Sequence, residues 1–590
     1  MTSTKDAVNN GRADDLKSTL PTLTPSSPTP IASSERPRVP HPVSKATFSV
    51  PSVIPPEHSH RTLVLCFDGT GDQFDADNSN IVQLVSLLKK NDRNKQMVYY
   101  QSGIGTYTPS RAVSPRWSTF QKVLDHMVAW SLNAHVMGGY EFLMQNYIEG
   151  DKICIFGFSR GAYTARSLAG MLHKVGLLPA DNFQQIPFAY KMYTRVDHIG
   201  WEQSTGFKKA FCSDVTIDFI GVWDTVDSVG IFPKRLPFTT SNGIVRVFRH
   251  AISLDERRSK FKTNLWSRSH PDEHPSVEAS PSQVTETCTS PDSYVNEKIP
   301  SVPTSPSSSY PSGKRSGSGN IGGILQKNLG LRRVQTWDGD GGSTHDKKLD
   351  TMEAIYSATS PKKLEEPTNT EEVWFAGCHC DVGGGAVSNK TRHSLARISL
   401  RWMIRECFKT NTGIMFESEG LQEIGLDPAT LYPFALPRPP PLKLKSEHKI
   451  QKPPADPIPV RPHATLYKKR PAEIQAHHTF YPSPFLGSEE AEELQDALSP
   501  AYDQLKLRKG WWILEILPIQ LRYQRGNNEW VTRFGSNLAR PRFIPKQITH
   551  GVKVHRSVKM RMEAEYEDER KRGKRYRPKA QLRVEPTWID

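Results

Sequence analysis

A serine between two glycines is the residue of this chain best placed to do chemistry. Residues 153–162 predict a buried strand that runs into Gly157-Phe158-Ser159-Arg160-Gly161 and then into a helix. A strand-to-helix turn of this kind presents the serine as a nucleophile for acyl transfer. The helix N-terminus and the Arg160 N–H would stabilise an oxyanion formed there. The alternative is a tight turn in which Ser159 only caps the helix.

An acid and a base follow that serine in the order that such a nucleophile needs. Asp224 comes directly after a predicted strand that ends at Trp223, and His379 follows another strand in a glycine-rich loop. In α/β-hydrolases the chain order is serine, acid, histidine, because the acid and the base lie on loops after later strands. His379 would take the proton of Ser159, and Asp224 would hold the imidazole in the correct tautomer.

Other acids and bases compete for these roles. Asp218 lies inside the predicted strand, and Asp227 lies farther beyond its end than Asp224 does. His250 is expected on a helix, and His555 lies near the end of the last folded segment. A structural turn or cap for the aspartate, and a structural hydrogen bond for the histidine, are the alternatives to a catalytic triad.

The loop after the first strand, Phe67-Asp68-Gly69-Thr70-Gly71-Asp72, has two interpretations. An acidic loop of this type would indicate a phosphotransferase, but Cys66 stands where the nucleophilic aspartate would be. The loop is better suited to the second side of an oxyanion hole, with the Gly69 and Thr70 N–H groups as donors. Asp68 would either bind a cation or brace the loop, and both alternatives remain open.

A metal centre is not expected. Cys378-His379-Cys380 offers at most three crowded ligands, and no second Cys-x-x-Cys pair could complete a tetrahedral zinc site. The sequence therefore predicts neither a metal nor a cofactor.

The elements around these residues alternate between strands and helices. Apolar patterning predicts strands at 63–67, 97–100, 153–156, 215–223 and 373–376, and helices at 81–88, 120–147, 162–172, 253–261 and 395–404. Strands that alternate with helices form a parallel sheet. The expected fold class is α/β and α/β-hydrolase-like, with a mostly parallel central sheet, flanking helices and long disordered insertions.

Composition divides the chain into seven segments. These are a disordered N-terminal tail (1–58), the first part of the hydrolase domain (59–266), a disordered Ser/Pro-rich insertion (267–370), the second part of the domain (371–410), a Pro-rich variable region (411–490), a C-terminal folded segment (491–558) and a charged tail (559–590).

Several motifs together resemble one family, the α/β-hydrolases of the type VI secretion phospholipase effectors (Tle-type), formerly a domain of uncharacterised function and common in fungi. The similarity covers about residues 61–265 and 372–410 and is weaker in the C-terminal segment. Four stretches carry it: Phe67-Asp68-Gly69-Thr70-Gly71, Gly157-Phe158-Ser159-Arg160-Gly161-Ala162-Tyr163-Thr164-Ala165-Arg166, Gly221-Val222-Trp223-Asp224-Thr225-Val226 and Gly377-Cys378-His379-Cys380-Asp381-Val382-Gly383-Gly384-Gly385.

The resemblance implies a hydrolase of ester bonds, with Ser159, Asp224 and His379 as nucleophile, acid and base. Bacterial members attack phospholipids. This chain departs from the family pattern in Cys380, where serine is common, and in the insertion between acid and base.

Charge and apolar content bear on partners and compartment. The chain of 590 residues has 77 Lys and Arg against 62 Asp and Glu, a net charge of +15, and seven scattered cysteines. The cysteines show no disulfide framework, and neither a spanning helix nor a secretory signal is visible, so an intracellular, cytoplasmic location is expected. The basic run 570–579 would suit peripheral contact with anionic lipid or a nuclear-localisation signal, and nucleic-acid binding is not expected.

Two hypotheses follow. The first is a serine hydrolase that cleaves carboxylic esters, with a lipid, such as a phospholipid, or a small ester as substrate. The second is a non-catalytic interaction protein on the same fold. The complete set of nucleophile, acid and base favours the first, and the oligomeric state is not predicted.

Overall fold

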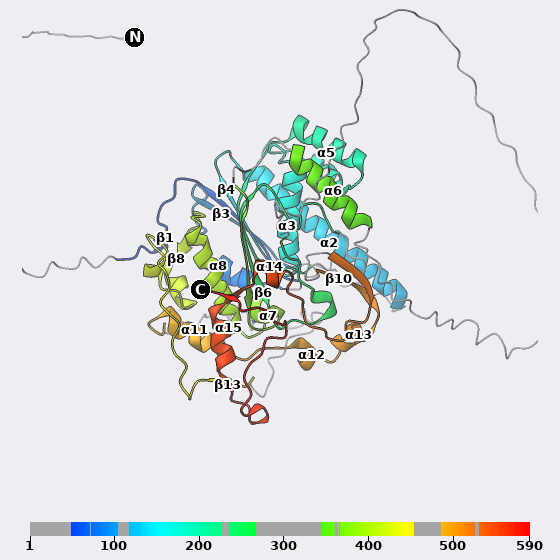
Figure 1. Ribbon diagram of the computed structural model, residues 1–590. Helices are drawn as coiled ribbons and strands as arrows, with labels where there is room; N and C mark the ends of the chain where they lie inside the picture. Colours follow the sequence, from blue (N-terminus) through cyan, green and yellow to red (C-terminus); the bar gives the residue numbers. More distant parts are fainter. Residues whose placement is uncertain are drawn as a thin grey trace, which may run out of the picture. The chain divides into compact units, whose positions relative to one another are not determined.

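The computed structural model describes one large body that begins at residue 50 (Figure 1). The described residues are 49–70, 72–103, 117–226, 235–266, 344–359, 364, 366–453, 485–524 and 530–590. None of the helices in these ranges is long and apolar enough to cross a bilayer.

A parallel sheet of eight strands forms the centre of the body. Its order is β14-β12-β7-β6-β5-β4-β2-β3, and every adjacent pair is parallel. The fold therefore confirms the expected α/β-hydrolase-like class. The strands are β2 (Thr62–Phe67), β3 (Gln96–Gln101), β4 (Lys152–Phe158), β5 (Ile217–Trp223), β6 (Val245–Ser253), β7 (Asn369–Phe375), β12 (Lys553–His555) and β14 (Thr587–Ile589).

Helices cover both faces of this sheet, and each face has its own apolar core (Figure 1). Both faces of β2 and β4 are buried, which explains their continuous apolar sequences. On one face lie α2 (Trp117–Asn146), α3 (Arg160–Val175), α4 (Ile186–Thr194) and α5 (His198–Phe211). On the other lie α1 (Asn80–Leu87), α8 (Leu395–Lys409), α9 (Ser418–Glu423) and α11 (Glu489–Ala497).

Further elements complete the body. In the described ranges the other α-helices are α6 (Thr344–Thr359), α7 (His379–Gly383), α12 (Gln504–Leu507), α13 (Trp511–Ile516), α14 (Gln547–His550) and α15 (Arg556–Glu563). Three small pairings join β1 (Val53–Ile54) to β8 (Phe416–Glu417), β9 (Lys449–Ile450) to β13 (Glu565–Tyr566), and β10 (Ile519–Gln524) to β11 (Trp530–Gly535).

The helix predicted at 253–261 is wrong. β6 occupies 245–253 between β5 and β7, and only a single 3-10 turn follows, at Ser259–Phe261. β6 carries polar side chains on a strand that is buried almost throughout, because Arg249 pairs with the buried Glu406 and His250 with the partly buried Glu372. Because Arg249 and His250 are polar, the apolar pattern of the sequence did not reveal the strand.

Three of the predicted segment boundaries change. The N-terminal tail ends before β1, and residues 1–48 lie outside the described ranges. Most of the Ser/Pro-rich insertion, 267–343, also lies outside them, but its end forms α6, whose Leu349 and Tyr356 are buried beside Trp201 of α5. In the Pro-rich region, 411–453 packs on the body, while 454–484 is not described.

The prediction that residues 559–590 form a charged tail is also corrected by the structure. Residues 559–590 complete α15 and add β13 and β14, and β14 is the outermost strand of the central sheet beside β12. Tyr576 and Ala580 are buried, and the Tyr576 hydroxyl donates to Asp255 at 2.6 Å. A few apolar anchors among many charges hold this segment, and composition alone does not reveal them.

Candidate active site

The register of the central strands brings three predicted residues to one edge of the sheet. Phe158 pairs with Trp223 and Trp223 with Ala251, so the carboxyl ends of β4 and β5 lie level, and β6 continues two residues further, to Ser253. Ser159 and Asp224 come directly after β4 and β5. β7 pairs beside β6 and leads into the loop that carries His379. Open α/β sheets hold their ligands at this edge.

Ser159 has the backbone conformation of a nucleophile elbow. Its φ is 59° and its ψ −121°, a region in which a serine is strained by on the order of 1–3 kcal/mol. It precedes α3 but makes no side-chain cap hydrogen bond, so the capping interpretation does not describe this serine. The turn also requires its two glycines. A Cβ on Gly157 would lie 2.5 Å from the Gly161 carbonyl oxygen, and one on Gly161 would lie 2.3 Å from that of Phe67.

Hydrogen bonds connect the three side chains in series. The hydroxyl of Ser159 lies 2.8 Å from Nε2 of His379, and Nδ1 of His379 lies 2.5 Å from Oδ2 of Asp224. All three side chains are buried, with Ser159 only 5 % exposed. With Asp224 ionised, Nδ1 carries the proton and Nε2 faces the serine as an acceptor. This arrangement is able to remove a proton from Ser159.

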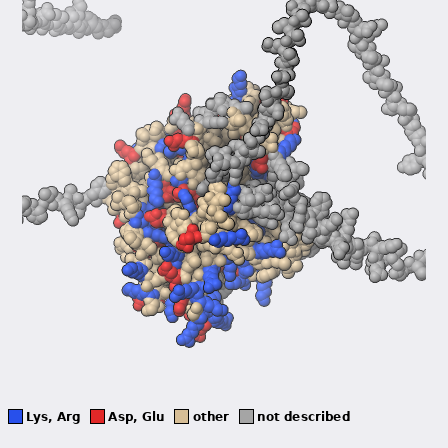
Figure 2. Space-filling model, viewed as in Figure 1, with Lys and Arg blue, Asp and Glu red and all other residues tan. Residues whose placement is uncertain are grey.

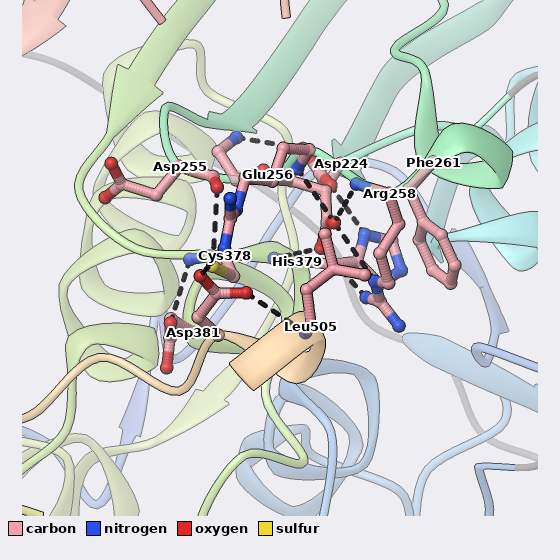
Figure 3. A network of polar contacts seen from close by, with 12 residues as sticks. Asp224, Asp255, Glu256, Arg258, Phe261, Cys378, His379, Asp381 and Leu505 are labelled. Atoms are coloured by element: carbon pink, nitrogen blue, oxygen red, sulfur yellow. Dashed lines mark hydrogen bonds and ion pairs between the residues drawn. The ribbon is translucent and has the colours of Figure 1, made fainter. Parts of the chain in front are cut away.

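Aromatic rings hold His379 in place. Phe158 lies against one side of its ring at 4.7 Å, and Phe261 meets it edge-on at 4.8 Å. Figure 3 shows His379 among Asp224, Glu256 and Arg258, with the Phe261 ring beside them. Burial lowers the pKa of His379 below its ordinary value of 6.5, although the charge of Asp224 acts in the opposite direction.

The competing acids and bases have other partners. Asp218 lies near the start of β5, where it accepts a hydrogen bond from the Ile153 N–H and pairs with Arg246, and Asp227 lies outside the described residues. His250 accepts from the Thr225 N–H and faces Glu372.

His555 stacks on Phe375 at 4.9 Å, and its Nδ1 lies 2.9 Å from the Ser557 hydroxyl. Burial lowers its pKa to about 3. Of the candidate bases, His379 is the one that the structure joins to Ser159.

The loop after β2 meets the expectations only in part. Asp68 accepts hydrogen bonds from Ser79 at 2.6 Å, from Tyr100 at 2.9 Å and from the Gly69 N–H at 2.8 Å. Asp68 therefore braces the loop, and burial raises its pKa to about 6. Gly69 does not meet the expectation of an oxyanion donor, because its N–H already donates to the Asp68 carboxylate.

The side chains of Arg160 and Thr70 lie together beside the turn formed by residues 157–161. The Arg160 side chain donates to the Thr70 hydroxyl at 3.0 Å. This bond ties the first residue of α3 to the loop after β2. The first N–H groups of a helix have no acceptor within the helix, so the Arg160 N–H suits an oxyanion.

Sequence reasoning missed one residue of the site, Arg542. Its guanidinium forms a bidentate pair with Asp224, with Nη1 to Oδ1 at 2.5 Å and Nη2 to Oδ2 at 2.9 Å. Arg542 stands in an irregular stretch between β11 and α14, where no motif marks it. No sequence signal could have found it.

Further acidic residues organise the loop that carries the base. Glu256 accepts from the His379 N–H at 3.3 Å and pairs with Arg258 at 2.8 Å. Asp255 accepts from the Gly377 N–H at 2.8 Å and from the Lys579 N–H at 2.9 Å. The segment 559–590 is thus joined through Asp255 to the loop that carries His379.

One other group of side chains has the composition of a metal site. Among the described residues, His393, Glu492 and Asp496 bring their ligand atoms close together. Arg397 pairs with Glu492 at 3.2 Å, and Arg401 pairs with Asp496 at 2.6 Å. These cations already neutralise the carboxylates, so the group resembles a buried ion-pair network.

Comparison with known proteins adds a family and a relative. The family model described as "T6SS, Phospholipase effector Tle1-like, catalytic domain" matches residues 61–406. The "Uncharacterized protein YEL023C" of Saccharomyces cerevisiae is 28 % identical over 582 residues, which cover 89 % of this chain and 82 % of the yeast protein.

Two solved structures are also similar, at low TM-scores. One is an uncharacterized protein from Pseudomonas aeruginosa, with 14 % identity and a TM-score of 0.27 over 60 % of this chain and 46 % of the other. The second is the Tle1 effector bound to the VgrG spike of the type 6 secretion system, with 17 % identity and a TM-score of 0.19 over 35 % and 47 %. This chain thus spans less than half of either of those chains.

Proposed function

Because this chain belongs to the family of Tle1-like phospholipase effector catalytic domains, we propose that it is a serine hydrolase that cleaves carboxylic esters of phospholipids or other lipids. Ser159, Asp224 and His379 would form its catalytic triad. The observation that carries the proposal is the continuous series of hydrogen bonds from Asp224 through His379 to Ser159.

Each residue of the series has one task in the reaction. Nε2 of His379 takes the hydroxyl proton while Oγ of Ser159 attacks the ester carbonyl carbon. The imidazolium then returns that proton to the departing alcohol oxygen, which leaves an acyl-serine. Water, deprotonated by the same nitrogen, releases the fatty acid. Asp224 stabilises the imidazolium in both steps.

The oxyanion would lie at the N-terminus of α3. The Arg160 N–H is the proposed first donor, and the Thr70 N–H, on the loop braced by Asp68, is the proposed second. Donors fixed in a buried site stabilise charge more strongly than water does, because they need no reorganisation.

The pH dependence of ester hydrolysis follows from the environment of His379. The base must be neutral, so activity is lost as pH falls through its pKa, which burial lowers below 6.5. We expect the acid limb of kcat/KM for a soluble p-nitrophenyl ester to have its midpoint below pH 6.5. A midpoint above 6.5 would mean that the attraction of Asp224 outweighs burial.

Exposed apolar side chains lie on α13 and on the chain from β11 to α14, and we propose that they contact the lipid surface. Trp511, at the start of α13, packs on Phe261, whose ring touches His379. We call the exposed apolar residues from α13 to α14 the apolar rim: Trp512, Ile513, Ile516, Leu517, Phe534, Leu538, Phe543 and Ile548.

Exposed basic side chains gather in the residues that follow β13. Figure 2 shows Lys and Arg over the lower part of one face, where Figure 1 places β13. Exposed members there include Arg570, Arg572, Lys574, Arg575 and Arg577. Such residues attract anionic headgroups within about one Debye length, roughly 10 Å at 0.1 M salt.

Removing apolar area from the apolar rim is expected to lower activity on lipid vesicles much more than activity on soluble esters. Ile513 and Ile516 are 57 % and 60 % exposed. Their joint replacement by serine is expected to weaken sedimentation with anionic phospholipid vesicles, and fatty-acid release from them, at least about tenfold, because each buried isoleucine contributes about 1.5–3 kcal/mol. Hydrolysis of a soluble short-chain ester should change far less.

The matched control replaces Ile148, which follows α2, and Ile199 of α5, which are 64 % and 57 % exposed and lie outside the apolar rim. This control should bind and hydrolyse vesicles as the native chain does. Equal losses in both double variants would count against the rim, and a chain that cleaves soluble esters but never releases fatty acid from vesicles would be a small-ester hydrolase.

A further inference from the structure

We propose that Arg542 is a positioning residue for the acid of the triad, so that the catalytic unit of this chain extends into its C-terminal segment. The inference deepens the proposed function and rests on it. Arg542 lies far beyond residue 406, where the match to the family's catalytic domain ends. A residue outside that domain thus contacts the acid directly.

Hydrogen bonds use all three guanidinium nitrogens of Arg542. Besides the bidentate pair with Asp224, Nη1 donates to the Ser253 hydroxyl at 2.7 Å, and Nε and Nη2 donate to the Phe261 carbonyl at 3.0 and 2.6 Å. Arg542 is 3 % exposed. The guanidinium therefore links Asp224 to the end of β6 and to Phe261. The ring of Phe261 packs on His379.

The segment that carries Arg542 is itself anchored. Glu515 of α13 is fully buried and accepts from Asn537 at 2.6 Å and from the Ala539 N–H at 2.8 Å. Its other carboxylate oxygen accepts from the Ser259 N–H at 2.6 Å. Glu515 thus fixes the stretch before Arg542 to the chain that follows β6.

Two physical effects of Arg542 on Asp224 follow from this geometry. The carboxylate is fully buried, and burial alone would favour its protonated form, but the adjacent guanidinium and His379 hold its pKa well below the ordinary range. The planar fork also fixes the carboxylate plane, because it engages both oxygens at once. Oδ2 is then aimed at Nδ1 of His379 in every turnover.

The cation also offsets part of the negative charge that faces the base. The charged groups around His379 are Asp224 after β5, Glu256 and Arg258 after β6, and Arg542 behind Asp224. Removing one cation from this set favours the imidazolium. The acid limb of the pH–rate profile should then move to higher pH.

The test compares Arg542→Gln and Arg542→Lys in the full chain, with a soluble p-nitrophenyl ester as substrate. For Arg542→Gln we expect kcat/KM to fall by about 100-fold, as misaligned catalytic groups typically cause. We also expect the acid limb to rise by about one pH unit. Arg542→Lys keeps the charge without the fork, so its acid limb should stay in place while kcat/KM falls by about tenfold.

Arg561→Gln is the matched control, because Arg561 is also a buried C-terminal arginine, but it donates to the Ala497 and Ser499 carbonyls. It should lower thermal stability without moving the acid limb. The proposal is overturned if Arg542→Gln only lowers stability with the acid limb unmoved. If that variant does not fold, native kcat/KM in Arg542→Lys overturns it. Failure of the proposed function would look different, because Ser159→Ala would then retain activity.

Discussion

Ser159→Ala is expected to lower ester hydrolysis by about 10⁴- to 10⁶-fold, the range found when one member of a serine triad is removed. The alanine would lack the oxygen proposed to form the acyl bond, while the fold around it should not change. Ser159 is buried and its hydroxyl bonds only one side chain, His379, among the contacts that the structure records for it. The melting temperature should therefore stay within a few degrees of the native value, while p-nitrophenyl ester turnover disappears.

Ser167→Ala supplies the matched control for this variant. Ser167 lies on the same helix, α3, is fully buried, and donates to the Tyr163 carbonyl at 2.8 Å. Its replacement should leave turnover near the native rate. If Ser159→Ala hydrolysed esters as fast as Ser167→Ala does, another residue would be the nucleophile.

His379→Ala is expected to have the second-largest effect, a loss of about 10³-fold or more in kcat/KM. Without the imidazole, the Ser159 hydroxyl would lose its proposed base, and the departing alcohol its proposed acid. His555→Ala is the comparison, because His555 is equally buried but stacks on Phe375. It should lose stability rather than turnover. An inactive His555→Ala beside an active His379→Ala would reverse the assignment of the base.

The sequence predicted the parts of the site that stand directly after apolar strands. Ser159, Asp224 and His379 each follow the buried carboxyl end of a strand in a parallel sheet, and such ends meet at one edge. Strand order and register then determine which side chains meet. The pattern of strands and turns was therefore enough to name three residues far apart in the chain.

What the sequence could not predict depends on tertiary partners. β6 looked like the start of a helix, because its buried polar residues Arg249 and His250 carry no apolar signal. From the sequence, β14 has the appearance of a charged tail. Three residues are enough to pair with β12 at the sheet edge, and so short a strand leaves no recognisable apolar pattern. Arg542 stands in no motif, and only the folded chain brings it to Asp224.

Identification of the residue that reacts with a fluorophosphonate tests the central claim most directly. The full chain, treated with the probe and digested, is analysed by mass spectrometry for the modified peptide. Ser159 is expected to carry the adduct in the native chain, and none should form in Ser159→Ala. An adduct on a different serine, or equal labelling of both proteins, would contradict the proposed nucleophile.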